Sequence, residues 1–404
     1  MERTLASVHI TPKGERALRG GHPWVYDAEV TDITGAPADG DVVDIFTGKD
    51  RWLGAGFYNS RSKIRVRCFS RNANDRFDES FWRRALAYAV DYRAAVLDAA
   101  DFRCCRLIFG EADRFPGLTV DRFEDILVTE TLSLGMERIK PMLFPALIDI
   151  LRERGVAVRA VYERNESALR EKEGMARGKG FFCGEGDGHV EICENGIFYD
   201  VDYINGQKTG FFLDQKFNRR AIRQIASGRR VLDCFTHTGA FGLNAAAGGA
   251  KHVTSVDVSA DALAQAGRNA VRNGLEGKID FLCADVFDLL TELGGKGGRG
   301  QYDFIILDPP AFTKSGATVK SAFRGYKEIN RRAMQLLPRG GFLATCSCSH
   351  FMTDALFRDM LRQAASDAAV DLRQIEARQQ GPDHPILWNV PETDYLKFYI
   401  FQVV

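Results

Sequence analysis

The sequence lacks the features that would place it in a membrane, in an oxidising compartment or against a polyanion through its overall charge. It has 54 Lys and Arg residues against 54 Asp and Glu residues, so any nucleic-acid surface must be local. No apolar run approaches the ~20 residues that a membrane-spanning helix needs. The N-terminus shows no basic-then-apolar leader, and the nine cysteines are an odd number. These absences together predict a cytoplasmic protein with reduced thiols and no membrane contact.

Two families of ligand motif are also missing. No cysteine pair stands in CxxC spacing near histidines, so we expect no metal. Neither GxGxxG nor a P-loop lysine occurs, which argues against a diphosphate ligand. What is present is an ordinary globular composition, 45% hydrophobic and 27% charged, over 404 residues, enough for two or three domains.

The first 75 residues are predicted to form a small β-rich domain. Glycines separate three extended runs at residues 42–46, 52–58 and 64–69. Basic residues gather here, among them Lys13, Arg65 and Arg67, and they form either a solvated face or an RNA-contacting one. The segment 20–25, Gly-Gly-His-Pro-Trp-Val, resembles the start of the PUA domain of RNA-modifying enzymes, which favours RNA.

Residues 76–198 are predicted to form a central α+β domain that links and orients its neighbours. Helical spacing marks residues 81–97 and 136–154, and extended runs mark 119–120, 126–131 and 158–163. Asn195 and Gly196 separate the runs 190–193 and 197–203, which is a strong hairpin signal. No catalytic group of residues stands out in this part.

From residue 199 to 404 strands and helices alternate, which predicts a doubly wound, Rossmann-like parallel sheet. The expected strands are residues 230–234, 252–256, 279–283, 304–307, 341–347 and a late run at 395–403. The expected helices are residues 240–247, 260–273, 286–293 and about 320–337. Ligands in such sheets bind beyond the carboxyl ends of the strands.

The first of these strands ends in a candidate ligand site, Val-Leu-Asp-Cys-Phe-Thr-His-Thr-Gly at residues 231–239. Gly239 lets backbone approach a ligand, and the helix that follows offers free N–H groups. The candidate contacts in this turn are Asp233, Phe235, Thr238 and Gly239. With no phosphate cradle, the ligand is expected to be a nucleoside without phosphates, and S-adenosylmethionine (SAM) is the leading candidate.

The next two strands also end on acids. Asp257, followed by Val258, is placed to accept hydrogen bonds from ribose hydroxyls. Asp285 suits an adenine amino group, with Val286 packing on the ring. The alternative for Asp285 is a helix N-cap, and one residue can do both.

The fourth strand end carries Asp308-Pro309-Pro310, with Phe312 close behind. Two prolines fix the backbone and remove two N–H donors, which leaves carbonyls free to accept an exocyclic amine or a flipped base. Asp308 could hydrogen-bond a ring nitrogen and belongs to the cofactor site as well. Phe312 could stack on a base, or it could be a core residue behind a stiff turn.

The fifth strand end brings two thiols, Cys346 and Cys348, in Thr-Cys-Ser-Cys-Ser-His. A cysteine that adds to carbon six of a pyrimidine makes carbon five nucleophilic enough to accept a methyl group. Cys348 lies nearer the carboxyl end and is the preferred nucleophile, whereas Cys346 fits an inert strand cysteine. His350 is either a structural contact or a proton carrier.

A polar segment, residues 205–219, precedes the first strand of the last domain, with two adjacent aromatics, Phe211 and Phe212, before a helix. It could cover the cofactor as a lid, with Gln215 reaching donor atoms. The alternative is a capped helix start with Asp214 as the cap.

Taken together, residues 206–219, the Asp308-Pro309-Pro310 motif, the Cys348 strand end and the tail 384–397 resemble the RlmI family over the whole chain. The resemblance implies a PUA domain, SAM as methyl donor, 23S ribosomal RNA as substrate, 5-methylcytosine as product, Cys348 as nucleophile and a homodimer. Two-cysteine RNA cytosine methyltransferases carry a second cysteine where this chain has Ala311, so another base must remove the ring proton. Two rival readings are an amino-group RNA methyltransferase that uses the Asp-Pro-Pro site, and a catalytically silent RNA-binding assembly factor.

Overall fold

The structure, a computed structural model, describes residues 4–295, 297–313 and 315–404. The chain divides into two compact units. Unit 1 contains the residues up to 192 together with 201–213 and 382–393, and unit 2 contains residues 193–200, 214–381 and 394–404. Each unit is described by itself.

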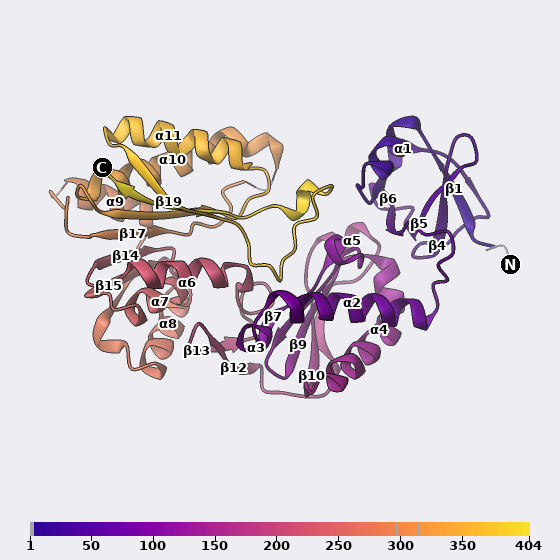
Figure 1. The fold of residues 1–404 in the computed structure, drawn as a ribbon, viewed down its shortest axis with the longest axis horizontal. Helices are drawn as coiled ribbons and strands as arrows, with labels where there is room; N and C mark the ends of the chain where they lie inside the picture. Colours follow the sequence, from indigo (N-terminus) through magenta and orange to yellow (C-terminus); the bar gives the residue numbers. More distant parts are fainter. Residues whose placement is uncertain (1–3, 296, 314) are drawn as a thin grey trace. The chain divides into compact units, whose positions relative to one another are not determined.

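The N-terminal part of unit 1 is a six-stranded sheet with one helix, drawn in indigo in Figure 1. Its elements are β1 (Ala6–Ile10), α1 (Pro12–Arg19), β2 (Trp24–Tyr26), β3 (Val30–Thr34), β4 (Val42–Thr47), β5 (Trp52–Tyr58) and β6 (Ile64–Ser70). The strand order is β2-β6-β5-β4-β1-β3, around a small core that includes Val8, Ile45 and Val66. The three strands predicted from the sequence are confirmed to within a residue, whereas β1, β2, β3 and α1 were not predicted.

The remainder of unit 1 is an α+β layer. Its elements are α2 (Glu79–Val96), α3 (Ala99–Phe102), β7 (Cys104–Phe109), β8 (Leu118–Phe123), β9 (Ile126–Thr131), α4 (Leu134–Glu153), β10 (Ala160–Asn165), α5 (Leu169–Lys172) and β11 (Gly178–Cys183). The sheet order is β11-β10-β9-β8-β7, and α2 packs on α4. A buried ion pair between Arg93 and Asp113 fastens α2 to the loop after β7.

A hairpin of β12 (His189–Glu194) and β13 (Ile197–Asp202) follows. Asn195 and Gly196 at its tip both have positive φ angles, 56° and 74°. Such a turn matches the twist of the two strands, which is why Asn-Gly predicted it.

Unit 2 is built on a seven-stranded sheet. Its elements are α6 (Lys216–Ile225), β14 (Arg230–Cys234), α7 (Ala240–Ala247), β15 (His252–Asp257), α8 (Ala260–Arg272), β16 (Ile279–Cys283), α9 (Val286–Gly295), β17 (Phe304–Leu307), α10 (Val319–Leu336), β18 (Phe342–Ser347), α11 (Asp354–Ala368), β19 (Leu372–Arg378) and β20 (Lys397–Val403). The order is β16-β15-β14-β17-β18-β20-β19. The first five are parallel, and β20 is antiparallel to both of its neighbours.

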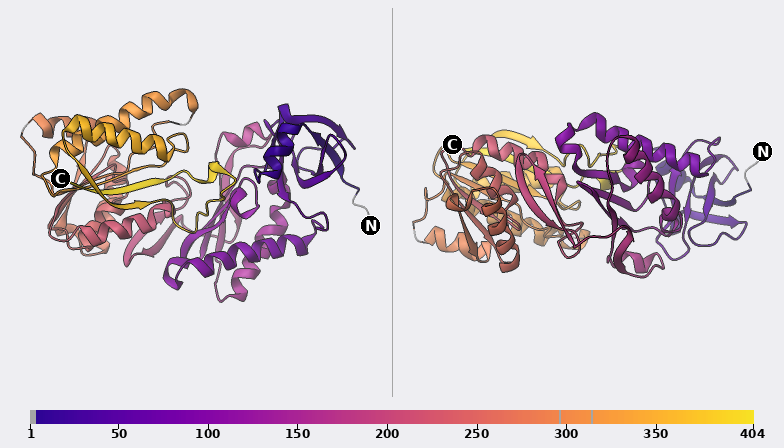
Figure 2. Two further views of the ribbon diagram at one scale, coloured as in Figure 1. Left: turned by 45° about the horizontal axis from the view of Figure 1, so that its top comes forward. Right: turned by 90° about the horizontal axis from the view of Figure 1, so that it is seen from below.

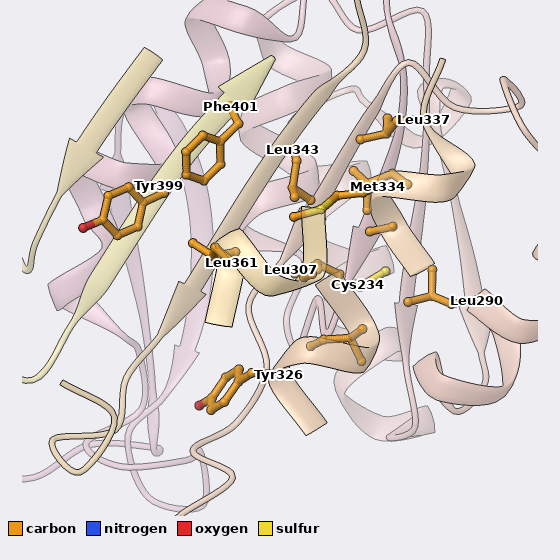
Figure 3. Close-up of a cluster of buried hydrophobic side chains, with 14 of the residues drawn as sticks. Cys234, Leu290, Leu307, Tyr326, Met334, Leu337, Leu343, Leu361, Tyr399 and Phe401 are labelled. Carbon is orange, nitrogen blue, oxygen red and sulfur yellow. The ribbon is translucent and has the colours of Figure 1, made fainter. Parts of the chain in front are cut away.

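Helices cover both faces of this sheet. Figures 1 and 2 show α6, α7 and α8 on one side and α9, α10 and α11 on the other. The α9–α11 side forms a continuous apolar core, part of which is drawn in Figure 3, where Cys234, Leu307 and Leu343 of the sheet face Leu290, Met334 and Leu361 of the helices. The predicted doubly wound fold is confirmed, and α11, β19 and the antiparallel direction of β20 are additions to it.

Candidate functional site

The central strand β14 ends on a carboxyl group that is fully buried. Asp233 Oδ2 accepts hydrogen bonds from the Thr236 hydroxyl, from the Gly242 N–H at 2.8 Å and from the Ser255 hydroxyl at 3.4 Å. Its other oxygen, Oδ1, is buried and has no partner among the described residues. Burial raises the pKa of Asp233 to about 7, since desolvation disfavours the charged form. A buried acceptor without a donor is what a ligand's ammonium or hydroxyl group would satisfy.

The turn after β14 is held in an unusual backbone conformation. Phe235, His237 and Gly239 all have positive φ angles, of 63°, 51° and 87°. Only glycine adopts this region without strain, so two strained non-glycine residues in one turn mark a candidate functional site. Thr238 lies within this turn, half-buried, and Gly239 forms the N-cap of α7.

The end of β15 is connected to the same turn. Asp257 accepts the N–H of His237 at 2.9 Å and the N–H of Ser259 at 3.0 Å. Val258 between them is 67% exposed. An acid with lone pairs still available and an exposed apolar side chain beside it can bind a group that is polar on one edge and flat elsewhere.

The end of β16 presents Asp285, which is exposed. Its carboxylate accepts the N–H of Phe287 at 2.7 Å and of Asp288 at 3.3 Å, so the helix-capping role weighed for it is present. Val286 is only 2% exposed and belongs to the core of unit 2.

The ends of β17 and β18 meet in a hydrogen-bonded group. Leu307 is level with Thr345 in the ladder, which places Asp308 beside Cys346. The Cys346 thiol donates to Asp308 Oδ1 at 2.9 Å, and Gln215 Nε2 donates to the same oxygen at 3.1 Å. Burial raises the pKa of Asp308 to about 6, against the opposing effect of these donors. Gln215 therefore lies beside Asp308. Gln215, and not Asp214, is the N-cap of α6, and no side chain caps that helix start.

The two thiols of β18 differ in their surroundings. Cys346 is 1% exposed, and burial together with the Asp308 carboxylate raises the pKa of its thiol well above the usual value. Cys348, the first residue beyond β18, is half-buried. A thiol that is buried against a carboxylate resists ionisation, so Cys346 is the poorer nucleophile.

The residues after Asp308 have two structural roles: the prolines shape the backbone, and Phe312 packs against other rings. Pro309 is buried and Pro310 is exposed. The ring of Phe312 lies 4.5 Å from that of Tyr326 and 5.9 Å from that of Phe287, centroid to centroid. The core role left open for Phe312 is therefore present, and base stacking remains a prediction.

The three basic residues predicted to contact RNA lie in unit 1. Lys13 is 79% exposed and pairs with Glu29 at 3.3 Å. Arg65 donates to the Asn59 carbonyl at 3.0 Å. Arg67 is mostly buried, and its guanidinium pairs with Glu111 at 3.3 Å and Glu173 at 3.0 Å.

Three residues of the site were not predicted from the sequence: Thr236, Gly242 and Lys397. A Cβ atom at Gly242 would lie 2.4 Å from Ser255 Oγ, so only glycine lets α7 approach the sheet and reach Asp233. The spacing Gly239-x-x-Gly242 carried this signal. Lys397 lies 4% exposed at the start of β20, and a Lys inside a strand otherwise rich in aromatic residues was the available signal.

Within the parts of the chain that the structure describes, no group of three or more His, Cys, Asp or Glu side chains is arranged to hold a metal ion. No helix in the same residues combines the length and apolarity needed to cross a bilayer.

Comparison with known proteins places the chain in a family. The sequence profile of the S-adenosylmethionine-dependent methyltransferases matches residues 164–401, and that of a PUA-like domain matches residues 8–71. Ribosomal RNA large subunit methyltransferase I of Aeromonas salmonicida is 40% identical over 392 residues, 96% of this chain and 97% of the relative. The protein of the same name from Pseudoalteromonas translucida is 39% identical over 98% of this chain and 99% of its own length.

Solved structures agree on the fold. A SAM-dependent methyltransferase from Streptococcus mutans superposes with a TM-score of 0.82 at 22% identity, covering 98% of this chain and 100% of that one. The methyltransferase SMU.776, in complex with SAH, gives a TM-score of 0.84 at the same identity and the same coverage. The chain uses SAM as its cofactor and belongs to the family of S-adenosylmethionine-dependent methyltransferases that includes ribosomal RNA large subunit methyltransferase I.

Proposed function

We propose that the protein methylates carbon five of a cytosine in 23S ribosomal RNA, through a covalent bond between Cys348 and the base. The names of its relatives support the substrate class. One observation carries the chemistry: the half-buried thiol of Cys348 directly follows β18, and Asp308, an acid whose pKa is raised, directly follows the neighbouring strand β17.

The strand ends around β14 suit the methyl donor. SAM supplies a methyl group activated on a sulfonium, and it carries an ammonium group, ribose hydroxyls and an adenine ring. The free oxygen of Asp233 would accept from the ammonium, and Asp257 and Asp285 would accept from ribose and adenine. The backbone of Phe235, Thr238 and Gly239 would line the approach, with Val258 and Val286 beside the ring and Gln215 closing the site toward Asp308.

The proposed reaction needs the Cys348 thiolate, a proton for the ring nitrogen, the methyl donor and a base. The Cys348 thiolate adds to carbon six, and the electron pair of the C5–C6 double bond is placed on carbon five as the ring nitrogen gains a proton. Carbon five would then take the methyl group from the sulfonium, whose sulfur leaves as a neutral thioether. A base would remove the remaining proton from carbon five, the C–S bond would break so that Cys348 leaves as the thiolate, and the C5–C6 double bond would re-form as the ring nitrogen gives back its proton.

Asp308 is suited to the ring nitrogen. Its pKa of about 6 leaves a protonated fraction near neutral pH, and a protonated carboxyl can donate to the nitrogen as negative charge develops there. The carbonyls of Pro309 and Pro310 would hold the exocyclic amine, and Phe312 would face the base. Such an arrangement requires that the base leave the RNA helix.

The basic residues of unit 1 are proposed to contact RNA phosphates. The exposed Lys13 and the half-buried Arg65 can do so. At Arg67 such a contact would compete with Glu111 and Glu173. Charge reversal of Lys13 should weaken RNA binding. It should also reduce the slope of the logarithm of the binding constant against the logarithm of the salt concentration by about one.

The decisive experiment traps the covalent intermediate. RNA that contains 5-fluorocytosine cannot lose fluorine from carbon five, so elimination stops and the protein stays attached. We expect wild type and Cys346→Ala to form the adduct in the presence of SAM, and Cys348→Ala to form none. An adduct that survives in Cys348→Ala would contradict the assignment.

A second measurement separates the alternatives. With labelled SAM and large ribosomal subunits or naked rRNA, loss of 5-methylcytosine in Cys348→Ala supports the proposal. Label found on an amino group, unaffected by that substitution, would favour the amino-group methyltransferase. No transfer to any RNA would favour a binding factor.

We further propose that the protein acts in the cytoplasm, where ribosomes assemble. We also propose that it is a homodimer, and light scattering would test its oligomeric state.

A further inference from the structure

Lys397 is a buried lysine tied to the segment that carries the Cys348 thiol. It opens β20 and lies across the ladder from Ser347, the last residue of β18. Its Nζ donates to the carbonyl of Ser349 at 2.6 Å and to that of Tyr395 at 2.8 Å. Because Ser349 directly follows Cys348, these bonds fix the amine next to the thiol-bearing residue.

The charge of this lysine has no carboxylate partner. Among the described residues no carboxylate lies within ion-pair distance of Nζ, and the charges that most raise the pKa of Lys397 are, in decreasing order, those of Asp394, Cys348 and Asp354. Asp354 already accepts a hydrogen bond from the Tyr399 hydroxyl, and Asp394 from Gln379. Burial lowers the pKa of Lys397 to about 8. A buried ammonium held only by neutral carbonyls is costly unless an anion forms nearby.

Two other titratable groups close to Cys348, a phenol and a thiol, carry no positive charge. The Tyr326 hydroxyl accepts from Ser347 at 3.0 Å, and burial raises its pKa, so it stays neutral. The Cys346 thiol is kept protonated by burial and by Asp308. His350, two residues further on, has a buried Nδ1 with no partner in the described chain.

We propose that the Lys397 ammonium is the counter-cation of the Cys348 thiolate and thereby sets the reactivity of that thiol. Lys397 is a positioning residue, since it acts through Cys348 and not on the base. The inference rests on the proposed function in naming Cys348 as the nucleophile. It is tested on the protein alone, without RNA or SAM, so the two can fail separately.

The experiment measures the apparent pKa of the Cys348 thiol from the pH dependence of its alkylation by iodoacetamide, read by mass spectrometry of the Cys348 peptide. An opposite charge within about 4–6 Å of an ionisable group moves its pKa by about one unit or more. We expect the native thiol to titrate about one unit below the same thiol in urea-unfolded chain. Lys397→Met should remove this difference and slow alkylation at pH 7 about tenfold, and Lys397→Arg should retain it.

Controls lie in the same molecule. Cys283 is exposed at the end of β16, and its alkylation should be the same in all variants. A Cys348 pKa that Lys397→Met leaves unchanged would overturn the inference. Should that variant not fold, a native wild-type pKa equal to or above the unfolded value would overturn it as well. A lowered pKa without any adduct on 5-fluorocytosine RNA would instead refute the proposed function and leave this inference standing.

Discussion

Replacing Asp233 with Asn should flatten the pH dependence of unit 2 stability. The carboxyl is fully buried and its pKa is raised from 3.8 to about 7. A raised folded-state pKa means that the stabilisation by the bound proton is complete below about pH 4 and is lost as pH rises through 7. This rise of about three pKa units corresponds to about 4 kcal/mol of folding stability over the full pH range. About 2 kcal/mol of it is lost between pH 5.5 and 8.5. The amide of Asn does not titrate, so the variant should not show this loss.

The assay can read each unit separately. Cys234 of β14 and Cys104 of β7 are both fully buried, one in unit 2 and one in unit 1. A brief pulse of methyl methanethiosulfonate after equilibration in urea labels each thiol only in unfolded molecules. The free energy of unfolding from Cys234 labelling should fall by about 2 kcal/mol more in wild type than in Asp233→Asn between pH 5.5 and 8.5. The Cys104 values should not differ.

Addition of SAM supplies a second readout, because a ligand that binds only the native state raises its stability. SAM should raise the urea midpoint of wild type, and Asp233→Asn should lose most of that gain because its buried position no longer carries a charge for the ammonium. Parallel pH profiles for the two proteins would refute the assigned ionisation. A full SAM effect in the variant would refute the cofactor contact.

Two further substitutions test the packing of each unit. Glu194→Gln should destabilise unit 2 by about 3–5 kcal/mol, because it leaves the buried Arg219 guanidinium without the carboxylate that now binds it at 2.6 and 2.7 Å, and Cys234 labelling in urea would measure the loss. Gly135→Ala should destabilise unit 1 by about 1–3 kcal/mol or more, since its Cβ would lie 2.1 Å from the Phe57 ring. Tryptophan fluorescence would report it, because all four tryptophans belong to unit 1, and an unchanged midpoint would contradict the close packing seen there.

The sequence predicted the sheet of unit 2 well because β14, β17 and β18 are buried on both faces and its parallel strands are bounded by turn residues. β14, β16 and β17 were predicted with their observed ends. β19 was missed because it is an edge strand with mostly exposed side chains and no regular alternation. Period-two patterning is the signal for a strand, and an exposed edge does not need it.

The candidate site was predictable only where topology determines position. Asp233, Asp257 and Asp308 lie at strand ends, so a parallel sheet brings them to one edge whatever the details. The contact between Cys346 and Asp308, and the approach of Lys397, depend on the ladder register of strands far apart in sequence. No local pattern encodes that register, which is why these contacts required coordinates.

The position of β20 has a consequence for synthesis. β19 emerges from the ribosome before β20, yet among the strands that the structure describes β19 pairs only with β20. The edge of the sheet must therefore wait, unpaired, until residue 403 has left the exit tunnel. Methyl-transfer competence would then arrive in a single late event, when the closing strand inserts and carries its lysine to the thiol.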